Sequence, residues 1–139
     1  MESFPSHVAD IYNEIISIEG KATVSEAAQK MLDHKIGCII ITDDGHPVGI
    51  VTKTDLLGRV IVANKDPNNT EIGSIMSKPL ITIPKEKPIL DAIREMRSKN
   101  VSRLVVTDNG NLVGLVSETD LIKAVQYASL TSFKSLLRP

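Results

Sequence analysis

Apolar residues along this 139-residue chain follow two different spacings, which alternate twice. Continuous apolar runs at Cys38–Ile41 and Leu104–Val106 are rich in β-branched residues, which is typical of short strands buried on both faces. Apolar residues at helical spacing in Ser25–Asp33 and Ile89–Lys99 predict two helices. The pattern therefore predicts an α/β (α+β) fold in which strands and helices alternate.

The same order of elements occurs twice, because the chain repeats itself at an offset of 65 residues. Ile16–Leu57 aligns with Ile81–Ile122 without a gap, and about thirteen of the forty-two pairs are identical. Each copy predicts a short strand, a helix, a two-stranded hairpin and a second helix, which is a βαββα unit. We expect one repeat over residues 1–63, a linker at 64–70, and a second repeat with a C-terminal helix over 71–139.

Short polar segments predict the hairpin turns. Asp43-Asp44-Gly45 and Asp108-Asn109-Gly110 contain residue types that tolerate positive φ, as tight hairpin turns require. Each turn is expected to fold the buried run back onto a further strand, at Val48–Val51 or Val113–Val116.

After each hairpin, a strand runs directly into a helix through a hydroxyl residue and an aspartate three positions later. These pairs are Thr52 with Asp55 and Ser117 with Asp120. One interpretation is a capping box, in which the two side chains satisfy free amide groups at the start of the helix.

The same residues also suit a ligand. A hydroxyl, free backbone N–H groups and the helix dipole favour a phosphate, and a carboxylate one turn along can accept both hydroxyls of a ribose. Thr54 and Thr119 add a second hydroxyl at the equivalent place in each repeat. The residues alone leave capping and ligand binding both open.

The complete unit, present twice in register, resembles a tandem cystathionine β-synthase (CBS) domain pair, often called a Bateman module. The resemblance rests on the Asp-x-Gly hairpin followed by Gly-apolar-apolar-Ser/Thr-x-x-Asp-Leu, and it covers about Ile11 to Val125. It implies that the repeats pack as a pseudo-twofold pair with two clefts between them, which usually hold adenosine derivatives.

For one cleft, the resemblance implies that Asp120 binds the ribose hydroxyls and that Ser117 and Thr119 bind the phosphate. The other residues implied for it are Ser102, Arg103 and Leu115, with Ile16, Ile18, Ile36 and Gly37 of the other repeat. In the second cleft Asp55, Thr52 and Thr54 take the corresponding roles. The other residues implied there are Ile50 and Cys38, with Ile81, Ile83 and Val101 around the base. The base would be recognised largely by backbone groups of the short first strands.

The two clefts are not expected to be equivalent. Where the second repeat has Ser102-Arg103, the first has Gly37-Cys38, so the sequence indicates an arginine only for the Asp120 cleft. Because a guanidinium can bind a phosphate through two parallel hydrogen bonds, we expect the Asp120 cleft to be the better nucleotide site.

Composition argues against several other functions. The net charge is −1, so the basic excess that binds nucleic acid is missing, and no apolar run approaches the ~20 residues of a membrane span. The single cysteine and the absence of a signal-like N-terminus favour a cytoplasmic protein. The three histidines lack the close spacing of a metal site, and no nucleophile–base set indicates an enzyme.

We therefore expect a non-enzymatic regulatory module that binds an adenine nucleotide, most readily AMP, and signals to a protein partner in trans. No obligatory cofactor is expected. A homodimer formed through flat helical faces is implied by the resemblance, and apolar residues near the end, Phe133, Leu136 and Leu137, either cover a partner subunit or fray. The alternatives are a ligand-free structural or protein-interaction module and, less favoured, a nucleotide-hydrolysing enzyme.

Overall fold

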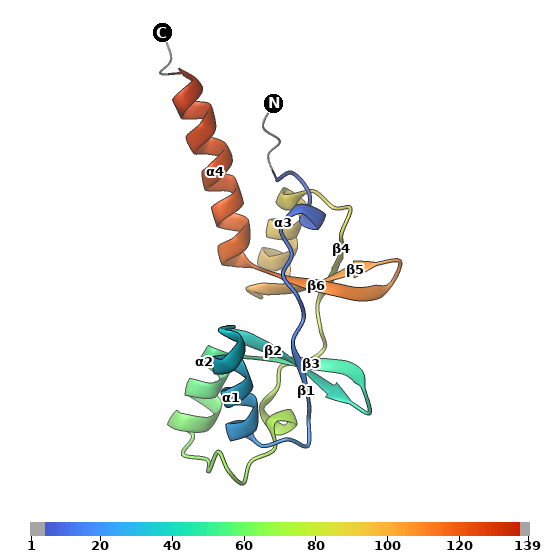
Figure 1. Ribbon diagram of the computed structural model, residues 1–139, viewed down its shortest axis with the longest axis vertical. Helices are drawn as coiled ribbons and strands as arrows, with labels where there is room; N and C mark the ends of the chain where they lie inside the picture. The colour runs from blue at the N-terminus through green and yellow to red at the C-terminus, as the bar shows by residue number, and fades with distance from the viewer. Residues whose placement is uncertain (1–4, 137–139) are drawn as a thin grey trace. The chain divides into compact units, whose positions relative to one another are not determined.

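The computed structural model describes residues 5–136, and their contacts form two compact units (Figure 1). One unit is Ile15–Leu80, which contains the first repeat. The other combines the described residues before Ile15 with those from Ile81 onward, and contains the second repeat. We call them the first unit and the second unit.

The first unit consists of one small sheet, two helical segments that follow its strands, and a short 3₁₀ turn. Its elements are β1 (Ser17–Glu19), α1 (Val24–His34), β2 (Cys38–Asp43), β3 (His46–Thr52), α2 (Lys53–Leu56), the π-helix η2 (Leu57–Val62) and the 3₁₀ helix η3 (Ile72–Ile75). The strand order is β1-β2-β3, with β1 parallel and β3 antiparallel to the central β2.

The second unit repeats this plan. Its elements are the 3₁₀ helix η1 (Val8–Asp10), β4 (Thr82–Pro84), α3 (Ile89–Lys99), β5 (Arg103–Asp108), β6 (Asn111–Ser117) and α4 (Glu118–Leu136). β4 is parallel and β6 antiparallel to the central β5. The mixed fold class and the twice-repeated βαββα order are thus confirmed, and the predicted bounds of the helix Ile89–Lys99 coincide with α3.

Each unit has its own hydrophobic core, built around its central strand. In the first unit Ile39, Ile41 and Val51 pack with Ala27 and Met31 of α1. The equivalent core of the second unit contains Leu104, Val106, Val116, Ala92 and Met96. The intervening Ile40 and Val105 are also buried. Both central strands are therefore covered on both faces, as their continuous apolar runs predict.

The predicted hairpin turns are confirmed. Asp44 and Gly45 have φ values of 49° and 80°, and Asn109 and Gly110 have values of 51° and 82°. Two successive central residues with positive φ define the type I′ turn, whose twist suits a tight hairpin. Asp, Asn and Gly are the residues that adopt this conformation at least cost.

Each unit also includes the segment that precedes the other repeat in sequence. Val8 is fully buried in the core of the second unit, and Asn13 pairs with Leu115 through N···O distances of 2.8 and 2.9 Å. In the first unit Ile72 and Ile75 are buried, and Ser77 pairs with Ile50 at 2.9 and 3.0 Å. We call residues 7–13 and 72–77 the leading segments.

Two glycines at equivalent positions make room for the leading segments. A Cβ added at Gly114 would collide with the ring of Tyr12 and lie 2.9 Å from the Asn13 carbonyl oxygen. A Cβ at Gly49 would lie 2.6 Å from Met76 Sδ and 2.8 Å from the Ser77 carbonyl oxygen. Close approach of two backbones therefore explains both glycines.

The residues expected to form a linker, 64–70, lie within the first unit. The carbonyl groups of Pro67 and Thr70 accept hydrogen bonds from the backbone N–H groups of Ser25 and Val24 at the start of α1. These contacts satisfy two of the amides that a helix start leaves without an intrahelical partner.

The longest helix is α4, and no helix in the described part of the chain is long and apolar enough to cross a membrane. Ile122, Val125, Tyr127 and Leu130 of α4 are exposed. The sequence predicts that Phe133, Leu136 and Leu137 either cover a partner subunit or fray. The side chains of Phe133 and Leu136, and the whole of Leu137, lie outside the described residues.

Candidate ligand-binding site

Both aspartates form a reciprocal capping box at the start of a helix. In the first unit the Thr52 N–H donates to Asp55 Oδ2 at 2.9 Å, and the Asp55 N–H donates to Thr52 Oγ1 at 3.2 Å. In the second unit the Ser117 and Asp120 N–H groups make the same exchange, at 3.1 Å each. The capping interpretation is therefore confirmed, and each cap leaves Oδ1 of the carboxylate for another partner.

The Asp120 carboxylate is also held by the leading segment of the chain. Asn13 Nδ2 donates to Asp120 Oδ2 at 2.8 Å, so this oxygen accepts two hydrogen bonds. Among the described residues, no hydrogen-bond donor contacts Oδ1 of Asp120. This oxygen and its remaining lone pairs are available to an outside donor, such as a hydroxyl group.

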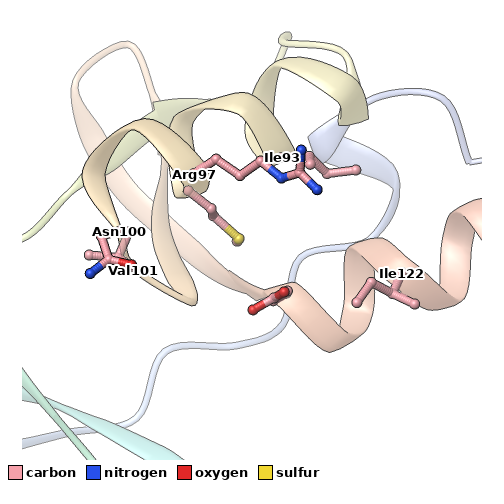
Figure 2. A pocket seen from close by; sticks show the side chains of 7 residues that line it. Ile93, Arg97, Asn100, Val101 and Ile122 are labelled. Carbon is pink, nitrogen blue, oxygen red and sulfur yellow. The ribbon is translucent and has the colours of Figure 1, made fainter.

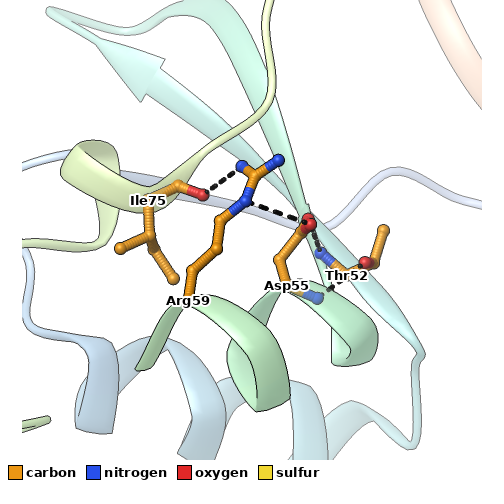
Figure 3. Close-up of polar contacts among 4 residues, drawn as sticks. All are labelled: Thr52, Asp55, Arg59 and Ile75. Carbon is orange, nitrogen blue, oxygen red and sulfur yellow. Dashed lines mark hydrogen bonds and ion pairs between the residues drawn. The ribbon is translucent and has the colours of Figure 1, made fainter. Parts of the chain in front are cut away.

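The Asp55 carboxylate has a different neighbour (Figure 3). Arg59 Nε lies 3.7 Å from Asp55 Oδ1, four residues along the same helical segment. Arg59 Nη1 also donates to the Ile75 carbonyl at 2.8 Å, which anchors the guanidinium to η3. Both oxygens of Asp55 therefore face a donor or cation within its own unit.

The expectation that only the Asp120 cleft has an arginine for a phosphate stays a prediction, but it took no account of Arg59, which lies beside Asp55. The repeat comparison missed it, since residue 59 lies just beyond the aligned block. The i, i+4 spacing of an acid and a base on a helix was the available signal. Asn13 had no such signal, since it is 107 residues from Asp120 in sequence.

The residues opposite each cap come from the start of the central strand. Arg103 is the Cα partner of Ser117, and Cys38 is the partner of Thr52, so each pair lies side by side across the hairpin. Arg103 Nη1 is 3.2 Å from Ser102 Oγ. The structure thus brings Ser102, Arg103 and Ser117 together at one end of the second sheet, next to Asp120.

The residues just before these strands complete the two helix starts. The Ser102 carbonyl accepts from the Glu118 N–H at 2.8 Å, and the Gly37 carbonyl accepts from the Lys53 N–H at 3.0 Å. Thr54 and Thr119, the second residues of their helices, are exposed. Their hydroxyls are therefore accessible at the same ends of the two sheets.

The strand residues predicted for the site have backbone groups that are already in use. Leu115 and Ile50 exchange hydrogen bonds with Asn13 and Ser77 of the leading segments. Leu115 is buried, and Ile50 is half-buried. Their contribution to a site would therefore be apolar contact.

The residues predicted to enclose the base lie next to the two cores. Ile16, Ile18 and Ile36 are half-buried and pack against the core of the first unit. Ile81 and Val101 pack in the same way in the second unit, whereas Ile83 is a core residue with 4% exposure. Each predicted cleft combines residues of both units, and this combination stays a prediction.

A separate pocket of about 260 Å³ lies between α3 and the start of α4 in the second unit (Figure 2). Its lining residues are Ile93, Met96, Arg97, Asn100, Val101, Glu118 and Ile122. Of the predicted site residues it includes only Val101. Its volume is below the range of about 300–1,000 Å³ that is usual for small-molecule sites.

Within the described residues, no group of three or more His, Cys, Asp or Glu side chains is arranged to hold a metal ion. The potential ligand chemistry at the two caps is therefore that of hydroxyl, amide, carboxylate and guanidinium groups. These groups can bind a sugar and a phosphate, and we refer to them as the Asp55 half-site and the Asp120 half-site.

The chain belongs to the CBS domain family. The family's sequence model matches it twice, over residues 8–62 and 72–127, which correspond to the two repeats. The match confirms the resemblance that the duplicated hairpin and cap motifs indicate.

Several curated proteins are similar in sequence to this chain. An uncharacterised protein of Methanopyrus kandleri is 33% identical over 120 residues, which are 85% of this chain and 61% of the relative. An uncharacterised protein of Methanocaldococcus jannaschii is 26% identical, and the chain covers 62% of it. The chain thus spans about three fifths of the length of these two relatives. Hypoxic response protein 1 of Mycobacterium tuberculosis is 28% identical, with 94% of this chain and 93% of the relative covered.

Solved structures agree with the fold. An uncharacterised conserved protein from Pyrococcus horikoshii superimposes with a TM-score of 0.79 at 25% identity, covering 89% of this chain and 95% of that chain. A hexameric CBS-CP12 protein from bloom-forming cyanobacteria gives 0.76 at 27% identity, with 84% and 66% covered. Hypoxic Response Protein I, described with two coordinated zinc ions, gives 0.69 at 28% identity, with 84% and 97% covered.

Proposed function

We propose that this chain is a cytoplasmic, non-enzymatic regulatory module that binds an adenosine derivative and signals its presence to a protein partner in trans. The ligand class is AMP, ADP, ATP or S-adenosylmethionine, with AMP the first candidate. Membership of the CBS family supports a regulatory, ligand-binding role in general. The choice of adenosine derivatives is part of the proposal.

One observation supports the proposal: the Asp120 half-site combines a carboxylate, a hydroxyl and a guanidinium, which are groups that can bind a sugar and a phosphate. Asp120 is fixed by three hydrogen bonds, two through its carboxylate Oδ2 and one through its backbone N–H. Oδ1 remains available to a ribose hydroxyl, while Arg103 lies across the hairpin from Ser117. A carboxylate held in this way needs little reordering when it binds a diol.

The protein partner is proposed to respond to a conformational equilibrium of the module. A ligand shifts such an equilibrium only to the extent that it binds the two conformations with different affinity. The base is proposed to lie against the apolar residues predicted above, so the ligand would contact residues of both repeats. Ligand binding would then favour one conformation of the module, and the partner would respond to it.

The first test is calorimetric titration of the full chain with AMP, comparing the wild type with Asp120→Ala and Asp120→Asn. Loss of charge-assisted hydrogen bonds worth about 1.5–3 kcal/mol should weaken binding roughly ten- to a hundredfold. Asp120→Asn keeps an oxygen that can accept from the Ser117 N–H, so it should fold normally and still bind more weakly.

Glu26→Ala is the matched control. Glu26 and Thr23 form a capping box of the same kind at the start of α1, outside the predicted site. Removal of this capping box by Glu26→Ala should leave the affinity for AMP unchanged. Equal AMP binding by the wild type and both Asp120 variants would show that the assignment of Asp120 is wrong.

A homodimer is part of the proposal. Exposed apolar side chains on the helices, including Leu32 on α1, Leu57 and Ile61 on η2, and Ile122 on α4, support an association between helical faces. Light scattering should give a mass of twice 15.1 kDa. Leu57→Asp, which places a charge on one such face, should shift the mass toward the monomer.

A ligand-free interaction module is the second candidate, because the confirmed capping boxes account for the repeated Ser/Thr-x-x-Asp geometry of both units without a ligand. Thermal shift with AMP, ADP, ATP and S-adenosylmethionine separates the two candidates, since a ligand that binds the native state raises the Tm. Product formation on prolonged incubation with ATP would instead indicate a hydrolase.

A further inference from the structure

Asp55 and Asp120 occupy equivalent positions in the two repeats, but among the described residues only Asp55 has an ion-pair partner. Arg59 lies 3.7 Å from Oδ1 of Asp55, while Oδ2 accepts from the Thr52 N–H at 2.9 Å. The hydrogen bond from Arg59 to the Ile75 carbonyl, 2.8 Å long, holds the guanidinium there (Figure 3). The Asp55 side chain is 14% exposed, and Arg59 is one of the groups that a ligand approaching Oδ1 would meet.

The π-helical turn η2 explains how Arg59 reaches this position. At the offset of 65 residues, Arg59 corresponds to Ala124, which is 7% exposed and belongs to the core of the second unit. In the first unit the core residue is instead Val60, at 1% exposure. The wider winding of Leu57–Val62 shifts the buried position from residue 59 to residue 60.

Because of this change of winding, the side chain of Arg59 is not packed in the core. In α4, which is α-helical throughout, the position equivalent to Arg59 is packed inside. In the first unit, the Arg59 side chain is 48% exposed and lies beside Asp55. Single turns of π-helix occur often at functional sites, and here the turn places a cation beside Asp55.

We propose that Arg59 makes the two half-sites unequal, so that a ligand with a vicinal diol fills the Asp120 half-site first. A diol donates two hydrogen bonds, and a single carboxylate oxygen with both lone pairs available can accept them. At Asp120 one oxygen has no donor among the described residues, and the diol can bind directly. At Asp55 the diol must displace Arg59, and the ion pair weakens the carboxylate as an acceptor. The inference rests on the proposed function and names the residue that sets the order of filling.

The test is calorimetric titration with AMP of the full chain in four forms: wild type, Arg59→Ala, Arg59→Met and Arg94→Ala. The wild type should show two sites that differ about tenfold or more in affinity. Arg59→Ala should tighten the weaker site about tenfold. Arg59→Met retains the packing of the side-chain stem and should have the same effect, which guards against a folding defect.

Arg94→Ala is the matched control. Arg94 is also an exposed arginine paired with an acid on its own helix, with Nη1 3.4 Å from Asp91 Oδ1. It lies outside both half-sites, so its removal should change neither affinity.

A second ligand separates a direct effect from general loosening of the helix. The gain in affinity should disappear with 2′-deoxy-AMP, because this ligand lacks one of the two hydroxyls that would donate to Asp55. A purely structural effect of Arg59→Ala would change the binding of AMP and 2′-deoxy-AMP alike, and would overturn the inference.

The remaining outcomes distinguish the inference from the proposed function. If Asp120→Ala removes the stronger site but Arg59→Ala leaves the weaker one unchanged, the inference is wrong and the proposed function stands. If Arg59→Ala weakens the second site, Arg59 contacts the ligand's phosphate and the inference is also wrong. If no adenosine compound binds the wild type or Arg59→Ala, both are wrong.

Discussion

The two units have the same strands, turns and caps, yet they hold their equivalent aspartates by different means. Asp55 pairs with Arg59 of its own helical segment, whereas Asp120 accepts a hydrogen bond from Asn13 of the leading segment. The shared features follow from residues that the repeat preserves, such as Thr52 and Ser117 at the caps. The differences come from positions outside the aligned block. A duplicated sequence can therefore keep one architecture and still give its two sites different chemistry.

The largest effects should come from the cores, where the two units are expected to behave alike. Ile39 and Leu104 are equivalent and are 1% and 0% exposed. Replacing either with alanine removes buried methyl groups and leaves a cavity, so each variant should lose about 3 kcal/mol of unfolding free energy in urea titration. Leu90→Ala, at a site that is 59% exposed, should change the unfolding free energy by less than about 0.5 kcal/mol. A large loss for only one core variant would show that the cores are unequal.

The glycines under the leading segments should separate the units more clearly. Gly114→Ala places a methyl group against the Tyr12 ring, and Gly49→Ala places one against the flexible side chain of Met76. Both variants also crowd a carbonyl oxygen, so each should lose about 1–3 kcal/mol, with Gly114→Ala at the upper end.

Two variants check that interpretation by differential scanning calorimetry. Tyr12→Ala combined with Gly114→Ala should recover part of the lost Tm. Gly58→Ala, where no atom beyond the chain neighbours and the adjacent helix backbone lies within 4 Å of the added Cβ, should not lower the Tm. A Tm for Gly114→Ala equal to that of the wild type would contradict the close approach of Tyr12.

The helix caps should contribute equally in the two units. Thr52→Ala and Ser117→Ala each remove the oxygen that accepts from the N–H of the aspartate three residues later, and each should cost about 1 kcal/mol in urea unfolding. The exchange variants Thr52→Ser and Ser117→Thr retain a hydroxyl and should be close to the wild type. Exchange variants as unstable as the alanine variants would mean that packing, rather than the cap, sets the cost.

The smallest effect is a pH dependence confined to the first hairpin. Hydrogen bonds from the Gly45 N–H and the Thr42 hydroxyl lower the pKa of Glu19 below its ordinary value of 4.5. A carboxyl group whose pKa is lowered by folding stabilises the native state above its unfolded pKa, and the contribution is lost as the pH falls through the folded pKa. The position equivalent to Glu19 in the second unit is Pro84, which cannot titrate.

Amide exchange measured from pH 6 to pH 3 should therefore show the Gly45 amide losing protection relative to the Gly110 amide, after correction for intrinsic exchange rates. Glu19→Gln should remove most of this pH-dependent difference. If the Gly45 and Gly110 amides of the wild type lose protection equally as the pH falls, the Glu19 contact is not the cause of the pH dependence.

Much of the fold could be predicted from sequence because its signals are local. Apolar runs, helical spacing, Asp-x-Gly turns and Ser/Thr-x-x-Asp caps each depend on a few neighbouring residues, and the duplication allowed each to be checked against its copy. The same locality explains why both capping boxes were found, while the ligand assignment still depends on the resemblance to the family.

The features that sequence did not predict depend on contacts between distant residues or on subtle changes of winding. The hydrogen bond between Asn13 and Asp120 joins residues at opposite ends of the chain, and the spacing of apolar residues does not indicate it. The π-helical turn at Leu57–Val62 follows a sequence that an ordinary helix would also accommodate. The i, i+4 spacing is enough to predict the pair between Arg59 and Asp55. The same spacing does not show that Arg59 lies outside the core of its unit.

The exchange of leading segments bears on how such a chain can be divided. A fragment ending at the predicted linker would lack Ile72, Ile75 and Ser77, which complete the first unit, and a fragment beginning there would lack Val8 and Asn13. Each half would thus expose apolar surface and leave strand backbone groups unpaired. Neither repeat is a self-sufficient building block, so recombination that preserves stability has to transfer both repeats together.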